Sequence, residues 1–597
     1  MLQQISLNSF WKFIIDDQDK GREQKWFENM PENMSDIWVP SCWNECSEEW
    51  FHYEGVAWYF RKFLYRKDPE IKRNVLFFNG VNYSCEVWMN GCFAGAHTGG
   101  FTPFEMDVTE LIREDGENFV AVRVDSTMTD MTVPPMGVDW FNYGGIFREV
   151  YLQGTGASWL EDVFIVTSMN GEISIKLKAG GEQWNGTAKA DCAQADGSNG
   201  SDSVMKLHIT VDDPDAVKPV DDRWLDFGSK EFTAGLHLEN AKLWSPETPF
   251  LYTFTLELTN DGKITDRWEH KIGVREFSIR DRKILLNGKP VQLMGYSKHE
   301  EYPMHARTFS YDIVRKDYEL CKRSNANFIR MCHYPHHLKE YEIASEMGFI
   351  VMAEVPNVNF TKKQFEDREL LQNSINQTRE MIRYYKNETC IMFWSLFIEC
   401  RTSEDSAVES VPEYTKLVKQ MDPTRFTIHA SVIPLEDRTY EYFDIVGINY
   451  WSGWYYAESI EDGSKNLDRI ASRYPDKPVV LTSGGWEGIY GYHSYQKREK
   501  WSEEEQSEYL ENLIKMYMTK DYIVGAVIWT FNDFRVSPWV LSNNARWILR
   551  PMELNHKGVM DYFRRPKLSY YTMQKIYGQW SLRSEIKPLS GLPCKID

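Results

Sequence analysis

The stretch Ile391-Met-Phe-Trp-Ser-Leu-Phe-Ile-Glu399 is an apolar run of strand length that stops on a carboxylate. A continuous apolar run of this length is typical of a strand that is buried on both faces, as in a parallel sheet covered by helices. Further runs of the same kind lie between residue 274 and the C-terminus, separated by longer amphipathic segments. The alternation predicts repeated βα units.

Eight such strands can be placed in this half of the chain, and eight is the number that closes a TIM barrel. The predicted strands are 291–297, 328–333, 350–356, 391–399, 426–430, 444–450, 479–485 and 525–531. The preceding half has a different pattern, because short alternating segments such as Glu86-Val-Trp-Met-Asn90 are separated by turn residues. This pattern predicts β-sandwiches in the N-terminal half.

Composition sets limits on the class of protein. A chain of 597 residues with 42% apolar and 14% aromatic residues is long enough for about three to four domains. A formal charge of -20 argues against nucleic acid as a partner, because such partners require clustered Lys and Arg. No basic and apolar leader and no membrane-length apolar run is visible, so a cytoplasmic location without membrane contact is expected.

Polar residues fall where the predicted barrel strands end. His299 follows the first strand, His333 ends the second, Glu354 lies near the end of the third, Glu399 ends the fourth and Asn449 ends the sixth. The C-terminal ends of the strands carry the chemistry of TIM barrels. We therefore expect these side chains to lie together at one mouth of the barrel.

Glu399 is the first candidate for a general acid, because a carboxyl group at the end of a buried strand is a suitable proton donor. Two structural interpretations compete with this role. Glu399 could cap the following helix, or it could form an ion pair with an arginine.

Several motifs resemble the β-glucuronidases of glycoside hydrolase family 2, and the resemblance extends from end to end of the chain. They are Val87-Trp-Met-Asn-Gly91, Leu243-Trp-Ser-Pro246, Trp394-Ser395 followed by Glu399, and the stretch from Lys477 to Ser494. The resemblance implies a jelly-roll β-sandwich over residues 1–157, an immunoglobulin-like β-sandwich over 158–273 and a catalytic TIM barrel over 274–597. It also implies that Glu399 is the acid/base residue.

The sequence departs from the family at two catalytic positions. Ser483 stands where the family has its nucleophilic glutamate, and Ile398 replaces the asparagine that binds the 2-hydroxyl of the sugar. A serine hydroxyl is a weak nucleophile without an adjacent base. Glu487, four residues further on, is either a base or displaced nucleophile, or a solvent-facing loop acid.

Substrate recognition is predicted from the same resemblance. Asn555 and Lys557 match an Asn-x-Lys pair that binds the carboxylate of the sugar, Arg550 assists at a spacing one residue longer, and Asp139 matches a jelly-roll loop residue that contacts the sugar. Ammonium and guanidinium groups suit an anionic carboxylate. The other positions that match the sugar site are His299, His333, Asn449, Trp451, Tyr455 and Trp529.

No cofactor is predicted. The histidines at 333, 336 and 337 have no carboxylate at ligand spacing, so we predict that this cluster holds no metal ion. The ten cysteines are expected to be reduced thiols.

Three functional hypotheses remain open at this point. The favoured one is a hexuronidase that acts on carbohydrates with a terminal uronic acid by a non-standard mechanism. The alternative is an inactive, uronate-binding pseudoenzyme, and the third is a chain altered by design at its nucleophile. Retention of Glu399 favours the first hypothesis, and the family resemblance implies a homodimer or homotetramer.

Overall fold

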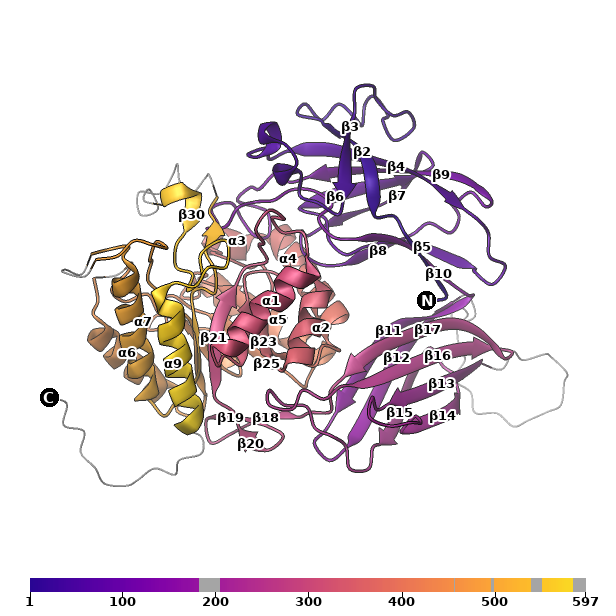
Figure 1. Cartoon of the computed structure of the whole chain (residues 1–597). Coiled ribbons are helices and arrows are strands. Elements are labelled where there is room, and N and C mark those ends of the chain that lie inside the picture. The colour runs from indigo at the N-terminus through magenta and orange to yellow at the C-terminus, as the bar shows by residue number, and fades with distance from the viewer. Residues whose placement is uncertain (182–204, 456, 495–498, 538–549, 584–597) are drawn as a thin grey trace.

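The computed structural model describes residues 1–181, 205–455, 457–494, 499–537 and 550–583. Two β-sandwiches, indigo and magenta in Figure 1, lie on one side of a helix-covered barrel coloured from pink to yellow. This arrangement confirms the predicted fold class, a jelly-roll β-sandwich and an immunoglobulin-like β-sandwich joined to a (β/α)8 TIM barrel. No described helix is long and apolar enough to cross a membrane.

The first sandwich consists of a six-stranded sheet, in the order β3-β2-β4-β9-β6-β7, facing a four-stranded sheet, β1-β10-β5-β8. Alternating apolar side chains of both sheets fill one core between them. The strands are β1 (Gln3–Ser6), β2 (Ser9–Ile15), β3 (Ser35–Val39), β4 (Val56–Tyr65), β5 (Arg73–Phe78), β6 (Ser84–Met89), β7 (Cys92–Thr98), β8 (Phe104–Asp107), β9 (Gly116–Asp125) and β10 (Val150–Thr155).

The second sandwich packs a three-stranded sheet, β11-β12-β15, against a four-stranded sheet, β14-β13-β16-β17. Along β13 every second side chain is buried, because successive residues of a strand point to opposite faces. The strands are β11 (Ser158–Thr167), β12 (Glu172–Gly181), β13 (Met205–Asp212), β14 (Asp221–Asp226), β15 (Glu231–His237), β16 (Tyr252–Asn260) and β17 (Lys263–Ile272).

The barrel contains all eight predicted strands, with ends that differ from the prediction by a few residues. They are β21 (Leu293–Lys298), β22 (Phe328–Met331), β23 (Ile350–Glu354), β24 (Ile391–Ile398), β25 (Phe426–Ala430), β26 (Val446–Asn449), β27 (Val479–Ser483) and β28 (Ile523–Ile528). All pairs are parallel, and a bridge between Ser431 and Ile448 closes the ring between β25 and β26. The strands are buried throughout, as the uninterrupted apolar runs predict.

Helices cover the outside of the barrel, and shorter elements complete the chain. The α-helices are α1 (Tyr311–Arg323), α2 (Leu338–Met347), α3 (Lys362–Glu366), α4 (Arg368–Tyr385), α5 (Asp405–Met421), α6 (Ile460–Arg473), α7 (Glu503–Met518) and α9 (Leu568–Arg583). The 3-10 helices are η1 (Trp43–Glu45), η2 (Glu48–Trp50), η4 (Tyr440–Tyr442) and η5 (Pro551–Glu553), and the short strands are β18 (Phe277–Arg280), β19 (Lys283–Leu286), β20 (Lys289–Pro290), β29 (Phe534–Arg535) and β30 (Leu554–Asn555).

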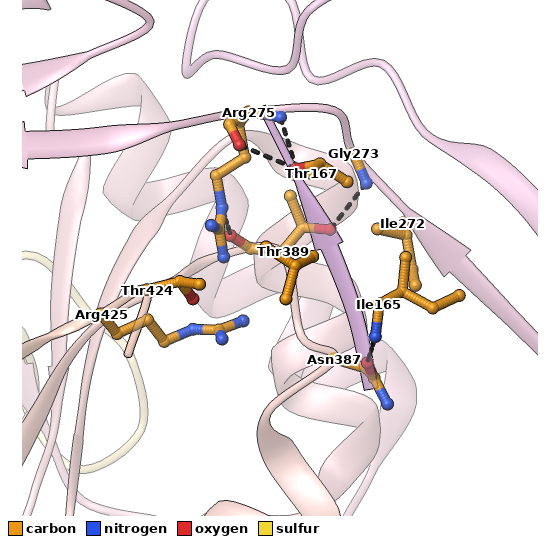
Figure 2. A pocket seen from close by; sticks show the side chains of 10 residues that line it. Ile165, Thr167, Ile272, Gly273, Arg275, Asn387, Thr389, Thr424 and Arg425 are labelled. Carbon is orange, nitrogen blue, oxygen red and sulfur yellow. Dashed lines mark hydrogen bonds between the residues drawn. The ribbon is translucent and has the colours of Figure 1, made fainter. Parts of the chain in front are cut away.

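Hydrogen bonds tie the second sandwich to the barrel, as Figure 2 shows. The Thr167 hydroxyl donates to the carbonyl of Arg275 and accepts from its backbone N–H. Arg275 Nε donates to the carbonyl of Thr389 at 2.9 Å. Asn387 Oδ1 accepts from the backbone of Ile165 at 3.0 Å. Because these bonds lie in a buried or partly buried junction, they help to fix the two domains relative to each other.

The first sandwich is joined to the barrel mouth by buried charges. Arg148 donates to Glu300 Oε2 at 2.7 Å, and Tyr143 OH donates to Glu301 Oε1 at 3.1 Å. Glu301 also accepts from the backbone of Arg535 at 3.1 Å. The jelly-roll loop that carries Tyr143 is therefore held over the ends of the barrel strands.

Glu301 makes stability depend on pH. Burial raises its pKa to about 7, whereas an exposed glutamate has a pKa of about 4.3. The folded state keeps a proton that the unfolded chain loses, so this part of the stability is fully present below about pH 4.3 and is lost by about pH 7. Glu301→Gln should raise the free energy of unfolding by up to about 3 kcal/mol at pH 8 and change it little at pH 4. Urea denaturation at both pH values measures this difference, and an equal effect at both would contradict it.

Candidate active site

Glu399 lies at the mouth of the barrel, directly after β24. Its Oε1 accepts hydrogen bonds from Asn449 Nδ2 at 2.7 Å and from Trp451 Nε1 at 3.0 Å. Its backbone is left-handed, with φ of 55°, an unusual conformation for a glutamate that the bond from its N–H to Ala430 O holds in place. Two donors from β26 and the following loop thus orient one carboxyl group toward the space above the barrel.

The two structural interpretations of Glu399 are wrong. Helix α5 has Glu404 as its N-cap, and within the described residues Glu399 forms no ion pair with an arginine. The carboxyl group is instead held by neutral donors. A carboxyl group held this way at the mouth of the barrel is suited to giving and taking a proton.

Ser483 ends β27, the strand beside β26, and pairs in register with Asn449. Its side chain is 1% exposed, and within the described residues its Oγ has no hydrogen-bond partner. The backbone beyond it is tightly constrained, because a Cβ at Gly485 would lie 2.1 Å from Trp529 O. Ser483 therefore lies one strand away from the residue that holds Glu399, on a rigid strand end.

Ile398 is buried in an apolar cluster at the same mouth. The cluster includes Trp140 from the jelly-roll loop, Val358 from the loop after β23, and Trp529 after β28. The Ile398 side chain is 1% exposed. It packs against these neighbours and has no hydrogen-bond donor or acceptor.

His299 and His333 lie against Trp529. His333 stacks on the indole with centroids 4.9 Å apart, and His299 meets it edge-on at 5.3 Å. Burial lowers the pKa of both imidazoles, and the charge of Arg307 lowers that of His299 further. Both rings are thus neutral and can exchange hydrogen bonds with sugar hydroxyls.

Glu354 is fully engaged within the protein. It accepts from Arg330 Nε at 2.9 Å and from Ser395 Oγ at 2.8 Å, and its other oxygen lies 2.9 Å from His333 Nδ1. Although burial opposes ionisation, Arg330 lowers the pKa of Glu354 below its ordinary value. The Glu354 carboxylate thus orients His333. Because it is ion-paired with Arg330, it is not a free nucleophile.

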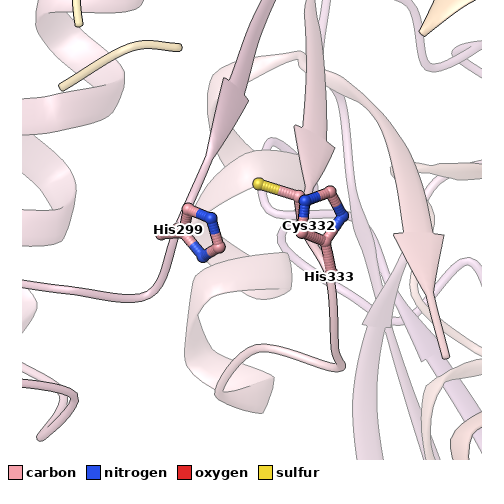
Figure 3. A group of neighbouring side chains, drawn as sticks. All are labelled: His299, Cys332 and His333. Carbon is pink, nitrogen blue, oxygen red and sulfur yellow. The ribbon is translucent and has the colours of Figure 1, made fainter. Parts of the chain in front are cut away.

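Figure 3 shows His299, Cys332 and His333 close together, with potential ligand atoms all within 4.8 Å of one another. Burial raises the pKa of the Cys332 thiol far above its usual range, and Arg330 and Arg307 add positive charge nearby. A protonated thiol beside two guanidinium groups is a poor site for a cation. The neighbouring histidines are committed elsewhere, His336 to Glu340 and His337 to Glu149.

Lys557 is buried in a cage of aromatic rings. Its Nζ lies 4.8 Å from the ring centroid of Trp454 and donates to Tyr455 OH at 2.9 Å. Arg550 Nη2 donates to the same hydroxyl at 3.3 Å. Both side chains are ion-paired with Glu487, whose Oε1 is 2.7 Å from Lys557 Nζ. Burial and the charge of Arg550 lower the pKa of Lys557, whereas the contact with the Glu487 carboxylate favours its ammonium form.

Glu487 is therefore not a solvent-facing loop acid. It is 1% exposed, so this interpretation of the sequence is wrong. The glycine-rich loop after β27 turns the carboxylate inward, toward the segment that carries Asn555 and Lys557. Its Oε1 is bound by two cations, whereas its Oε2 has no hydrogen-bond partner among the described residues, so a role as base or displaced nucleophile stays a prediction.

Asp139 reaches this pocket from the first sandwich. Its Oδ2 accepts from Asn555 Nδ2 at 2.8 Å and lies 3.6 Å from Arg550 Nη2. Trp451, whose Nε1 donates to Glu399, connects this group to the acid. Its ring packs edge-on against Tyr455, with centroids 5.2 Å apart, and lies 6.4 Å from the ring of Trp529. The predicted sugar-site residues thus form one continuous surface.

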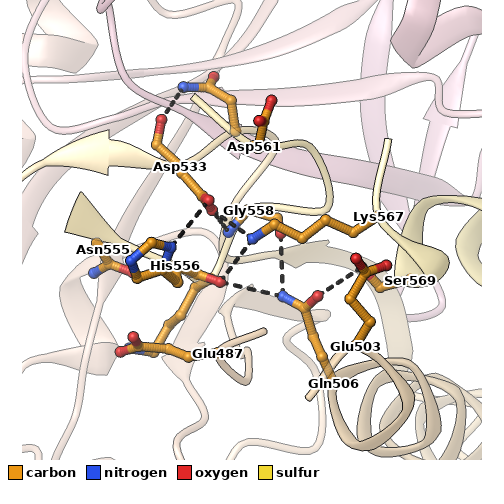
Figure 4. A network of polar contacts seen from close by, with 12 residues as sticks. Glu487, Glu503, Gln506, Asp533, Asn555, His556, Gly558, Asp561, Lys567 and Ser569 are labelled. Carbon is orange, nitrogen blue, oxygen red and sulfur yellow. Dashed lines mark hydrogen bonds and ion pairs between the residues drawn. The ribbon is translucent and has the colours of Figure 1, made fainter. Parts of the chain in front are cut away.

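A polar network beneath the pocket fixes its geometry, as Figure 4 shows. Asp533 accepts from Lys567 Nζ at 2.7 Å and from the backbone of Gly558 at 2.9 Å. Gln506 on α7 donates to the carbonyls of Trp486 and Gly558. The loop that carries Glu487 and the segment that carries Lys557 are therefore attached to the same helix.

The sequence reasoning missed three residues of this site. Trp140 packs on both His299 and His333, and Arg330 bonds Glu354 and the carbonyl of Thr482. A signal was present for Arg330, because a charged residue inside the apolar run of β22 must find a buried partner. Trp140 and Gln506 carry no such local signal.

The chain matches three family models. Residues 5–155 match the sugar binding domain of the glycosyl hydrolases family 2, residues 160–275 match the family 2 model for the middle domain, and residues 277–579 match its TIM barrel domain.

The chain is similar to β-glucuronidases over most of their length. A β-glucuronidase of Paenibacillus borealis is 26% identical, with 96% of each chain covered, and that of Homo sapiens is 26% identical, covering 97% of this chain and 91% of its own. Among solved structures, the β-glucuronidase from Ruminococcus gnavus in complex with D-glucuronic acid superposes with a TM-score of 0.84 at 26% identity, covering 96% of this chain and 97% of its own.

Proposed function

Because this chain belongs to glycosyl hydrolase family 2, we propose that it hydrolyses the glycosidic bond of terminal β-glucuronides, with Glu399 as the general acid. Relatives that match over nearly the whole chain are named β-glucuronidases, and one solved relative binds D-glucuronic acid. These matches support both the reaction class and the substrate class.

One observation carries the proposal. A carboxyl group oriented by Asn449 and Trp451 is connected, through Trp451 and Tyr455, to the cationic pair of Lys557 and Arg550. A uronate has both features that this surface addresses, a glycosidic oxygen to protonate and a carboxylate to bind. The aromatic rings of Trp451 and Trp529 between them suit the faces of a sugar.

We propose that water, rather than a protein carboxylate, attacks the anomeric carbon. A retaining enzyme needs a second carboxylate as nucleophile, and an inverting enzyme separates its two carboxyl groups by ~6.5–9.5 Å to admit water. Glu354 and Glu487 are held by ion pairs, and Ser483 has a short side chain. Glu399 would give its proton to the leaving oxygen as the bond to the anomeric carbon breaks. Water would add to that carbon and lose its proton to bulk solvent, from which Glu399 would be reprotonated.

A second candidate function is uronate binding without catalysis. It is favoured by Ser483 and Ile398, which remove a carboxylate and an amide from the reacting centre.

A cytoplasmic location and a homodimer or homotetramer stay predictions, which cell fractionation and size-exclusion chromatography with light scattering would test.

Product analysis by NMR separates the two functions. The protein is incubated with phenyl β-D-glucuronide and with uronate-terminated oligosaccharides, and the anomer released first is recorded. Direct attack by water predicts the α-anomer first, since the configuration inverts. Release of the β-anomer first would contradict the proposed water attack, and saturable binding without any product would favour the binding function.

A further inference from the structure

The carboxylate of Glu487 lies where the two cationic side chains of the pocket meet. Its Oε1 accepts a hydrogen bond from Lys557 Nζ at 2.7 Å and is ion-paired with Arg550. All three side chains are at most 2% exposed. Burying a carboxylate this deeply is tolerated only because the two cations compensate it.

The donors of the pocket are already directed at protein oxygens. Lys557 Nζ donates to Glu487 and to Tyr455 OH, and Arg550 Nη2 lies 3.6 Å from Asp139 while donating to Tyr455 OH. The amide of Asn555 donates to Asp139. A ligand carboxylate that approaches this group therefore meets cations that already hold a carboxylate.

Other charges nearby do not replace Glu487. Lys500 lies on the ring of Trp454, with its Nζ 4.2 Å from the ring centroid. Asp533 is bound to Lys567 and His556 in the network below the pocket. Among the described residues, Glu487 is thus the carboxylate that touches both Lys557 and Arg550.

We propose that Glu487 determines specificity as an internal carboxylate that competes with the carboxylate of the substrate for Lys557 and Arg550. The inference rests on the proposed function, because it takes the substrate to present a uronate to this pair. A uronate bound to Lys557 places a second negative charge close to Glu487. At an effective permittivity of ~20, two charges ~5 Å apart repel enough to weaken binding by up to roughly a hundredfold.

Glu487 also contributes to the stability of the folded protein. Two buried cations without a counter-ion would destabilise the pocket, and Glu487 supplies that counter-ion before substrate arrives. Its presence lowers the affinity for uronates but leaves the contacts with the other sugar hydroxyls unchanged. The effect should therefore depend on the carboxylate of the ligand.

Isothermal titration calorimetry with glucuronic acid and glucose tests the proposal, because the two probes differ only at C6. Glu487→Gln keeps the shape of the side chain and removes its charge. We expect it to bind glucuronic acid roughly tenfold more tightly than the wild type and glucose equally well. Glu487→Asp, which keeps the charge, should stay close to the wild type, and Glu487→Gln combined with Lys557→Met should lose the gain.

Several outcomes would overturn the proposal. An equal change for both sugars would mean that the pocket is merely loosened, and a selective loss of glucuronic acid would mean that Glu487 positions the cations. If the wild type prefers neither sugar while Glu487→Gln selects glucuronic acid, the inference holds and the proposed substrate class fails. If the wild type selects glucuronic acid and Glu487→Gln gains nothing, the inference fails alone. If neither protein distinguishes the sugars, both fail.

A measurement on the wild type keeps the proposal testable if the variant does not fold. A carboxylate arriving beside Glu487 favours protonation of one of the two acids. Titrations in buffers with different ionisation enthalpies should therefore show proton uptake with glucuronic acid and none with glucose. The absence of uptake with glucuronic acid that binds through Lys557 would contradict the competition.

Discussion

Glu399→Gln is expected to lower kcat for phenyl β-D-glucuronide by roughly 10²–10⁴-fold, the usual contribution of a general acid. The amide keeps an oxygen acceptor for Asn449 Nδ2 and Trp451 Nε1, so the site should hold its shape. It cannot donate the proton that the leaving oxygen needs. Affinity for glucuronic acid should change by no more than a few-fold, which calorimetry measures alongside steady-state rates.

The leaving group provides an internal control for this prediction. A 2,4-dinitrophenyl leaving group departs without protonation, so its glucuronide should be affected much less than the phenyl glucuronide. A uniform loss for both leaving groups would show that Glu399 is structural.

Lys557→Ala is expected to lower kcat/KM for glucuronides by roughly 10²–10³-fold, the usual effect of removing one partner of a buried charge pair. The ammonium group holds Glu487 at 2.7 Å, so its loss leaves that carboxylate and the substrate carboxylate facing each other across the pocket. Thermal unfolding of the variant checks that the barrel remains folded.

Phenyl β-D-glucoside distinguishes a loss of carboxylate recognition from general damage to the site. It lacks the carboxylate, so its kcat/KM should fall much less than that of the glucuronide. Lys520→Ala is a matched control, because Lys520, just after the end of α7, is likewise paired with an acid, Asp468 of α6. Equal losses for glucuronide and glucoside in Lys557→Ala would contradict a role in carboxylate recognition.

The pattern of apolar runs in the sequence was sufficient to predict most of the barrel strands. Continuous apolar runs such as Ile391–Ile398 became strands buried on both faces, and their polar ends came together at one mouth. The ends of β28 and β22 were less accurate, because the last residues of a strand depend on pairing with neighbours as well as on their own sequence. The interdomain contacts of Arg148 and Tyr143 had no local signal, since their partners lie more than 150 residues away.

The sequence by itself determined the barrel strands and the placement of Glu399 at a strand end, because both depend on periodicity. Its resemblance to the family implied the three-domain organisation and the missing carboxylate at Ser483, because these rest on the identity of motif residues. Only the tertiary structure decided the role of Glu487. Its partner Lys557 is 70 residues away and reaches it from a different barrel loop. The loop flanking Glu487 is as compatible with an exposed acid as with a buried one, and the ion pairs that bury it exist only after the barrel brings the two loops together.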